Sequence, residues 1–250
     1  MAKVNIIMRC FNRLEYTMLT IRNIDLLAGY DDYKIIAIDN NSSDGTWDWL
    51  QSIKKEGYYK IHPIHTEENL GDFGGTKLGY QNLDDDCIYT MQWDNDCPPI
   101  SHNFLKHMVG IMDLHEDIGQ LMLKRNGVGG VIPITNKQEF LNVVFGDAPM
   151  VTCVNMHRRE VVDNLNYWVV DESEFWDFQL NKRMLAAGYK LKKIENLRVL
   201  HIDNYKEEHM KKYNQGERYP LYFGSRKDRQ IYKGVKKVNY NVLNYKEIDD

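Results

Sequence analysis

An acidic triplet, Asp94-Asn95-Asp96, contains the residues of this sequence best suited to metal chemistry. The apolar residues from Ile88 to Met91 before it suit a buried strand, and Pro98 and Pro99 after it prevent a strand from continuing. Two carboxylates one residue apart at a strand exit suit a hard divalent cation such as Mg²⁺ or Mn²⁺, which prefers oxygen ligands. An acidic turn without a metal has the same composition, so the triplet needs support from the rest of the chain.

Strands and helices alternate through the first half of the sequence. The expected strands lie at residues 4–8, 33–38, 59–64 and 88–93, and the expected helices at 14–27, 47–53 and 74–83. This order predicts an α/β fold with a Rossmann-like, mostly parallel sheet flanked by helices. Ligands of such sheets bind at the carboxyl ends of the strands, where the polar loops 9–13, 39–46 and 94–97 follow.

The second half is less regular. Helices are expected at residues 104–114, from 157 onward and at 175–187, and strands at 150–156 and 191–200. Residues 127–134 suit a strand or a loop, and residues 135–149 form a mixed segment. From residue 205 to residue 237 the chain has ten Lys and Arg against four Asp and Glu, together with five tyrosines.

Composition and charge exclude several classes of protein. The chain has 250 residues, of which 43% are hydrophobic, and a net charge of -4, so no general attraction to nucleic acid is expected. The four cysteines, Cys10, Cys87, Cys97 and Cys153, lack paired spacing, which favours the reduced thiols of an intracellular, cytoplasmic protein. No apolar run approaches the ~20 residues that span a bilayer, so no transmembrane segment is expected.

Seven motifs in a fixed order, from about Val4 to His201, resemble those of the glycosyltransferase family 2 enzymes, which have a GT-A fold. The motifs are Phe11-Asn12-Arg13; Ile38 to Thr46; Asn69-Leu70-Gly71 with Gly79; Asp94 to Asp96; Arg158-Arg159-Glu160-Val161; Asp177 with Gly188-Tyr189-Lys190; and His201. The loop at 39–46 is the most specific of them. The resemblance implies an inverting transferase that uses a nucleoside-diphosphate sugar, and it covers about four fifths of the chain.

The resemblance also implies a division of the chain. Residues 1–203 would form the GT-A domain, with a nucleotide-binding half at 1–99 and an acceptor and catalytic half at 100–203. Residues 204–250, which follow the matched region, would be an extension packed on this domain. Their basic charge and tyrosines suit a lid over the diphosphate, a site for an anionic partner, or a solvated basic face. Peripheral contact with a membrane surface is compatible with this charge, although interspersed acidic residues dilute it.

Donor and metal contacts follow from the matched positions. Asp39, at a strand end, can accept a hydrogen bond from the imide N–H of a pyrimidine such as uracil, or it only stabilises its own turn. Asp44 is expected to cap the next helix. Asp96 would be the direct metal ligand, exposed and of little weight in the core, with Asp94 near the ribose and His201 as a further ligand. The expected donor-binding residues are Cys10, Phe11, Arg13, Asp39, Asn41, Lys77, Asp94 and Asn95, although Lys77 also suits a solvated role.

An inverting transferase needs a base that takes the proton of the acceptor hydroxyl. Counting back from Gly188 places Asp177 in this role, with Glu174 as the alternative, because Trp176 stands where the family usually has Glu. The other interpretation is that these acidic residues have no catalytic role and only interact favourably with the dipole at the start of a helix. Trp93, Trp168 and Trp176 are candidates for stacking on a sugar, or they belong to the core.

The preferred interpretation is a metal-dependent inverting glycosyltransferase that uses Mn²⁺ or Mg²⁺ and moves a sugar, from a UDP-linked donor, to a glycan or another hydroxyl acceptor. A nucleotidyltransferase is an alternative, but the loop at 9–13 lacks the glycines expected of its phosphate loop. A non-catalytic nucleotide- or glycan-binding module is another, because Trp176 departs from the family pattern. An NAD-binding protein is disfavoured, because no GxGxxG follows the first strand.

Overall fold

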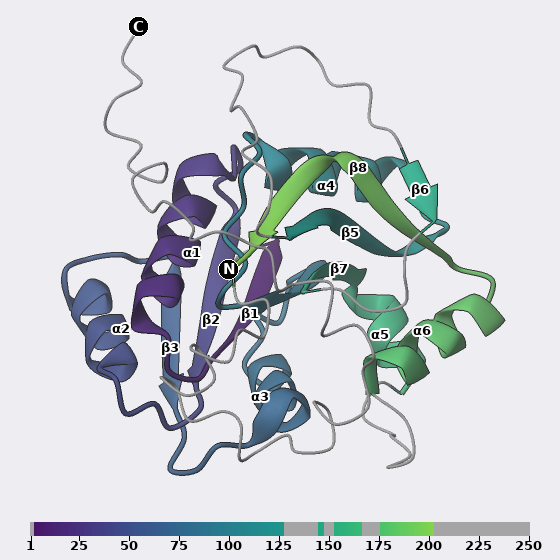
Figure 1. Ribbon diagram of the computed structural model, residues 1–250. Coiled ribbons are helices and arrows are strands. Elements are labelled where there is room, and N and C mark those ends of the chain that lie inside the picture. The colour runs from purple at the N-terminus through teal and green to yellow at the C-terminus, as the bar shows by residue number, and fades with distance from the viewer. Residues whose placement is uncertain (1–2, 128–144, 148–152, 167–175, 203–250) are drawn as a thin grey trace, which may run out of the picture.

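The structure is a computed structural model, and it describes residues 3–127, 145–147, 153–166 and 176–202. Its centre is a sheet of eight strands in the order β3-β2-β1-β4-β7-β5-β8-β6, with helices on both faces (Figure 1). Four of the seven strand pairings are parallel, which confirms the mostly parallel α/β sheet. The C-terminal extension lies outside the described residues, as does most of the segment from 127 to 153.

The first half of the chain folds as alternating strands and helices. Its strands are β1 (Val4–Cys10), β2 (Tyr33–Asp39), β3 (Ile61–His65) and β4 (Tyr89–Asp94), and all of their pairings with one another are parallel. Its helices are α1 (Leu14–Leu27), α2 (Thr46–Lys55) and α3 (Gly71–Tyr80). Helix α3 begins three residues before the predicted start at Gly74, and its first residue, Gly71, has a left-handed φ of +75° that glycine adopts easily.

The second half completes the sheet with strands of mixed direction. Its elements are α4 (Phe104–Leu114), β5 (Ile118–Gly127), β6 (Phe145–Asp147), β7 (Val154–Arg158), α5 (Arg159–Asn164), α6 (Trp176–Ala186) and β8 (Lys190–His201). Strand β7 runs antiparallel to both β4 and β5, and β8 is parallel to β5. Strand β5 was not predicted, because its buried residues Leu121, Met122 and Leu123 form only a short apolar run.

Side-chain alternation along the strands sends apolar residues to both faces of the sheet. The main buried cluster joins one face, including Ile6 and Met8 of β1, to helices α1, α2 and α4. A second cluster places α5 and α6, together with Tyr80 of α3, on the other face. Helix α3 approaches β1 so closely that a Cβ on Gly79 would lie 2.3 Å from Ile7, so only glycine fits there. No helix among the described residues is long and apolar enough to cross a membrane.

Candidate active site

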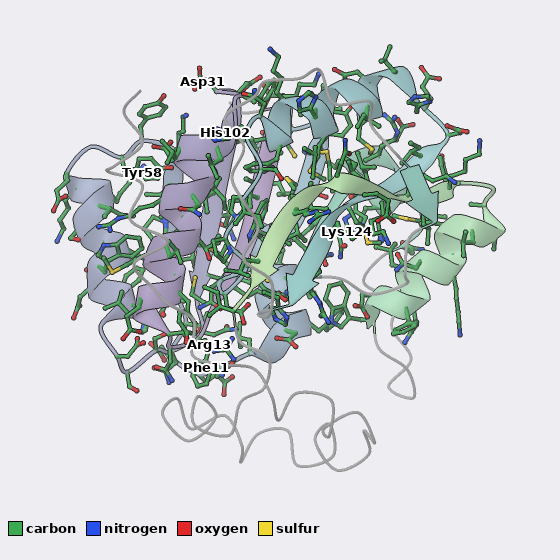
Figure 2. All side chains as sticks on the ribbon, turned by 45° about the horizontal axis from the view of Figure 1, so that its top comes forward. Phe11, Arg13, Asp31, Tyr58, His102 and Lys124 are labelled. Carbon is green, nitrogen blue, oxygen red and sulfur yellow. The ribbon has the colours of Figure 1, made fainter. Side chains whose placement is uncertain are left out.

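Three loops meet at the carboxyl edge of the parallel strands, and hydrogen bonds tie them together. The Asn12 side-chain oxygen accepts a bond from the backbone N–H of Ser43 (2.9 Å), and the Asn12 N–H donates to the Ser42 hydroxyl (2.8 Å). The Asn95 amide donates to the backbone oxygen of Asn12 (3.2 Å) and to the Thr17 hydroxyl (2.9 Å). Figure 2 shows Phe11 and Arg13 of the first loop at this edge. The loops after β1, β2 and β4 are therefore held as one unit.

Asp44 fixes the starts of two helices. One oxygen of its carboxylate accepts hydrogen bonds from the backbone N–H and the hydroxyl of Thr46, at 3.1 and 2.6 Å, at the start of α2. The other oxygen accepts the backbone N–H of Leu14, at 2.8 Å, at the start of α1. The predicted capping role is confirmed, and the same carboxylate also anchors α1.

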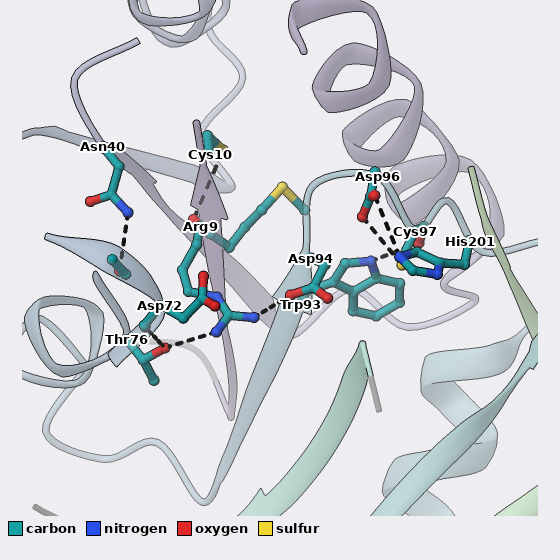
Figure 3. A network of polar contacts seen from close by, with 12 residues as sticks. Arg9, Cys10, Asn40, Asp72, Thr76, Trp93, Asp94, Asp96, Cys97 and His201 are labelled. Carbon is teal, nitrogen blue, oxygen red and sulfur yellow. Dashed lines mark hydrogen bonds and ion pairs between the residues drawn. The ribbon is translucent and has the colours of Figure 1, made fainter. Parts of the chain in front are cut away.

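Asp96 lies in a buried cluster of charged side chains (Figure 3). Its Oδ2 accepts a hydrogen bond from Arg13 Nη1 (3.0 Å) and lies 3.5 Å from His201 Nε2 at the end of β8. The Cys97 thiol approaches the other oxygen at 3.6 Å. Only 2% of Asp96 is exposed, so the expectation of an exposed ligand with little weight in the core is wrong. The fold brings Asp96 and His201 together although 105 positions separate them in the sequence.

Opposite charges decide the protonation of this pair. Burial on its own would raise the pKa of Asp96, but His201 and Arg13 outweigh it and hold that pKa well below its usual range. Burial would likewise lower the pKa of His201, but the Asp96 carboxylate raises it to about 9. Near neutral pH the cluster therefore holds a carboxylate between an imidazolium and a guanidinium.

Asp94, two residues earlier, faces a different partner. Its Oδ1 pairs with Arg9 Nη2, and about one third of its side chain is exposed. Arg9 Nη1 also donates to the Thr76 hydroxyl of α3 (3.4 Å), and that hydroxyl donates to the backbone oxygen of Asp72 (2.7 Å). Figure 3 shows Arg9 between Asp94 and Thr76. Arg9 was not among the predicted site residues, and the only local signal for it is its place near the end of β1.

Asp177 lies in the first turn of α6, within reach of the charges around Arg9. Its Oδ1 accepts the backbone N–H of Phe178 (2.9 Å). Burial raises the pKa of Asp177, while the positive charge of Arg9 acts in the opposite direction and the negative charge of Asp72 adds to the rise. A carboxylate with a raised pKa is a better proton acceptor than an ordinary one. The alternative base, Glu174, lies outside the described residues.

Asp39 is completely buried at the end of β2, and its two carboxylate oxygens differ. Oδ2 lies 2.7 Å from Nδ1 of His65 and accepts the backbone N–H of Ser42 at 3.3 Å. Oδ1 is buried and has no hydrogen-bond partner among the described residues. Asp39 therefore stabilises its turn with one oxygen and leaves the other for a hydrogen-bond donor.

The remaining predicted donor-binding residues occupy varied environments. Cys10 is buried, and its thiol points to the backbone oxygen of Met8 (3.9 Å), so only its main chain can face a ligand. Asn41 and Lys77 are exposed, and Asn41 has a left-handed backbone (φ 60°). Phe11 is partly buried, whereas Asn95 is buried within the loop contacts described above.

The tryptophans have different roles. Trp93 is fully buried, packs edge-on against Phe104 at 5.4 Å, and donates its N–H to the backbone oxygen of Cys97. Trp93 therefore belongs to the core, and its proposed stacking on a sugar is wrong. Trp176 is partly buried beside Phe73, with ring centroids 6.0 Å apart, and Trp168 lies outside the described residues.

The residues around Asp96 fit a divalent cation. The side chains of Asp96, Cys97 and His201 offer ligand atoms that all lie within 4.8 Å of one another. Carboxylate oxygen and imidazole nitrogen both suit Mn²⁺, and Mg²⁺ accepts the carboxylate. Burial raises the pKa of the Cys97 thiol well above its usual range, so the neutral thiol is a poor ligand for such hard ions. Asp96 and His201 are therefore the residues that would hold the ion, and His201 would have to release its proton to do so.

Comparison with solved structures shows proteins of the same fold. The chain superimposes on the TarS 1-349 fragment of S. aureus with a TM-score of 0.62 at 13% identity, covering 96% of this chain and 77% of that one. GalNAc-T7, solved with UDP, GalNAc and Mn²⁺, matches with a TM-score of 0.66 at 13% identity, covering 80% of this chain and 43% of that one. The mannosyltransferase PcManGT of Pyrobaculum calidifontis, solved with GDP-Man and Mn²⁺, has a TM-score of 0.63 at 10% identity and covers 86% and 61%.

Sequence comparison gives the family. A search of curated proteins finds no match. Residues 5–165 match the family described as Glycosyl transferase family 2, which is more than half of the chain. This range contains the strand ends with Asp39, Asp94 and Asp96, whereas Asp177 and His201 follow it. The chain therefore belongs to glycosyl transferase family 2 and is a glycosyltransferase with a GT-A fold.

Proposed function

We propose that this glycosyltransferase depends on a divalent cation, Mn²⁺ or Mg²⁺, and transfers a sugar from a UDP-linked donor to a hydroxyl group of a glycan or similar acceptor, with inversion at the anomeric carbon. The observation that carries the proposal is the contact between Asp96 and His201, because it joins the acidic exit of β4 to the end of β8. When bound there, the cation would stabilise the negative charge that develops on the leaving diphosphate.

The proposed donor site extends from Asp96 along the carboxyl edge of the sheet. Arg13 and Arg9 place positive charge beside Asp96 and Asp94, where the diphosphate and ribose would lie. Asp39, at the end of β2, would bind the base through Oδ1, since that oxygen can accept a hydrogen bond from the imide N–H of uracil. A neighbour of the same fold, TarS 1-349, was solved in complex with UDP-GlcNAc, which supports a uridine donor.

Asp177 is the proposed general base. It lies in the first turn of α6, close enough to Arg9 for that positive charge to act on it, and burial raises its pKa. A base that deprotonates the acceptor hydroxyl opposite the leaving diphosphate permits one direct displacement. The new bond from acceptor oxygen to anomeric carbon forms as the bond from that carbon to phosphate breaks, and the product is inverted.

A donor screen tests the proposal. The full chain is incubated with a panel of UDP- and GDP-sugars, with Mn²⁺ or with EDTA, and release of the nucleoside diphosphate is measured. Turnover that requires Mn²⁺ or Mg²⁺ and is lost in Asp96→Asn supports the proposal. Full turnover in EDTA would refute the metal dependence.

The same screen separates the alternatives. Thermal shift measurements with UDP, with and without Mn²⁺, report binding in the absence of turnover, because a ligand of the folded state raises its stability. Binding of UDP without turnover on any donor would favour a non-catalytic module. Release of diphosphate from a nucleoside triphosphate would favour a nucleotidyltransferase.

A further inference from the structure

The base-reading residue Asp39 is held in place by the neighbouring strand end. The backbone oxygen of Asp39 accepts hydrogen bonds from the N–H of Thr66 (3.0 Å) and from its hydroxyl (3.1 Å). The side-chain Oδ2 meets His65 Nδ1 at 2.7 Å. Residues 65 and 66, at the end of β3, therefore fix both the main chain and the carboxylate of Asp39.

His65 is itself held by an aromatic neighbour. Its ring lies 5.0 Å from the ring of Trp47, with 30° between the two planes, so the indole restricts how the imidazole can turn. About one third of the His65 side chain is exposed, whereas Asp39 is completely buried. His65 thus reaches from the protein surface to a buried carboxylate, with Nδ1 directed at one of its two oxygens.

We infer that His65 is a positioning residue for donor specificity: held by Trp47, it binds Oδ2 of Asp39 and thereby directs Oδ1 to accept the imide N–H of the donor base. The inference rests on the proposed role of Asp39. A carboxylate with a purely structural role would have both oxygens bonded when buried, but Oδ1 has no partner among the described residues. Without His65, the carboxylate could turn, and its geometry toward the base would be lost.

The relative affinities of two pairs of nucleotides report whether Oδ1 of Asp39 accepts a hydrogen bond from the base. UDP and GDP have a ring N–H next to a carbonyl, whereas CDP and ADP have a ring nitrogen lone pair at the matching position. An acceptor such as Oδ1 therefore favours UDP over CDP and GDP over ADP, while diphosphate and ribose contacts are the same within each pair. The ratio of dissociation constants within a pair reports base reading and is insensitive to a general loss of binding.

Two variants separate the functions of the His65 side chain. His65→Phe keeps a ring beside Trp47 but lacks the hydrogen-bond donor, and His65→Gln keeps an N–H donor but lacks the ring. Calorimetric titration of the full chain with each nucleotide, in Mn²⁺, is the measurement. His65→Phe is expected to lower the preference for the imide-bearing nucleotide by about tenfold or more, and His65→Gln by less than about threefold, since a hydrogen bond to a charged group is lost only in the first.

The Asp39→Ala variant distinguishes the possible failures. If Asp39→Ala loses the preference and His65→Phe keeps it, Asp39 reads the base unaided, and the inference is wrong while the proposed function stands. An equal loss of affinity for both members of a pair in His65→Phe would show a structural role only and would also overturn the inference. If Asp39→Ala keeps the preference, or if none of the four nucleotides binds, the proposed donor site fails and the inference fails with it.

Discussion

Replacing Asp96 by Asn tests the proposed metal site and the stability of the fold at once. The substitution keeps the size of the side chain but removes the charge that His201 and Arg13 face in a buried environment. The Asp96 carboxylate raises the pKa of His201 from 6.5 to about 9, a shift that corresponds to about 3 kcal/mol. Removing one partner of a buried pair generally costs about 3–5 kcal/mol. We therefore expect Asp96→Asn to lower the free energy of unfolding by about 3 kcal/mol.

Asp94→Asn is the matched control, with the same chemical change two residues away. Its partner is Arg9, and about one third of the Asp94 side chain is exposed, so solvent weakens the pair. The expected loss is at most about 1 kcal/mol. Urea unfolding of the full-length variants in EDTA, followed by circular dichroism, measures both values under metal-free conditions.

The same titrations with Mn²⁺ and UDP added measure ligand binding. A ligand that binds only the folded state at about 100 times its Kd adds about 2.7 kcal/mol to the stability. This increment should appear in the wild type and be absent from Asp96→Asn. An unfolding free energy equal to that of the wild type would refute the buried ion pair. A full Mn²⁺-dependent increment in Asp96→Asn would refute its role as metal ligand.

Three further predictions follow from the other charged groups. Asp177→Asn should lower the transfer rate by about 10²–10⁴-fold with donor affinity nearly unchanged, and Glu174→Gln is the paired control; loss in Glu174→Gln alone would identify that residue as the base. Arg9→Lys should weaken Mn²⁺-dependent UDP binding by about tenfold, because lysine lacks the two separate nitrogens by which the guanidinium contacts Asp94 and Thr76. An unchanged affinity in calorimetric titration would contradict this prediction. Burial lowers the pKa of His157 to about 4, so between pH 6.5 and 4 the unfolded chain binds a proton at this residue that the folded chain does not. The free energy of unfolding should therefore fall by about 3 kcal/mol over this range. Urea titrations should show a smaller fall in His157→Asn.

The first half of the fold could be predicted from sequence because its signals are local. Strands β1, β2 and β4 are short apolar runs, each followed by a polar loop, and α1 shows apolar residues at helical spacing. Strand β5 was missed because its place depends on pairing with β7 and β8, which come later in the chain. Three consecutive apolar residues cannot distinguish a strand from a short helical segment.

The acidic residues of the site were also found from sequence, together with Arg13 and His201, whereas the partners Arg9 and His65 were not. A short motif identifies Asp94 and Asp96 because only one residue separates them in the chain, and Asp39 is identified because it ends an apolar strand. Their partners come from other strand ends: Arg9 from β1, His65 from β3 and His201 from β8. Only the pairing order of the sheet, which local patterns do not specify, brings these ends together.

The pairing has a physical cause that also bears on function. A buried carboxylate without a cation costs several kcal/mol, so a site with Asp94 and Asp96 at this edge of the sheet needs basic groups nearby. Arg9 and Arg13 supply this charge at the ends of β1 and its loop, the edge where the diphosphate of a donor would arrive. In the proposed donor complex, the groups that stabilise these carboxylates would also contact phosphate oxygens. Arg9 would therefore serve both the fold and the proposed donor site, which the acidic motif alone does not reveal.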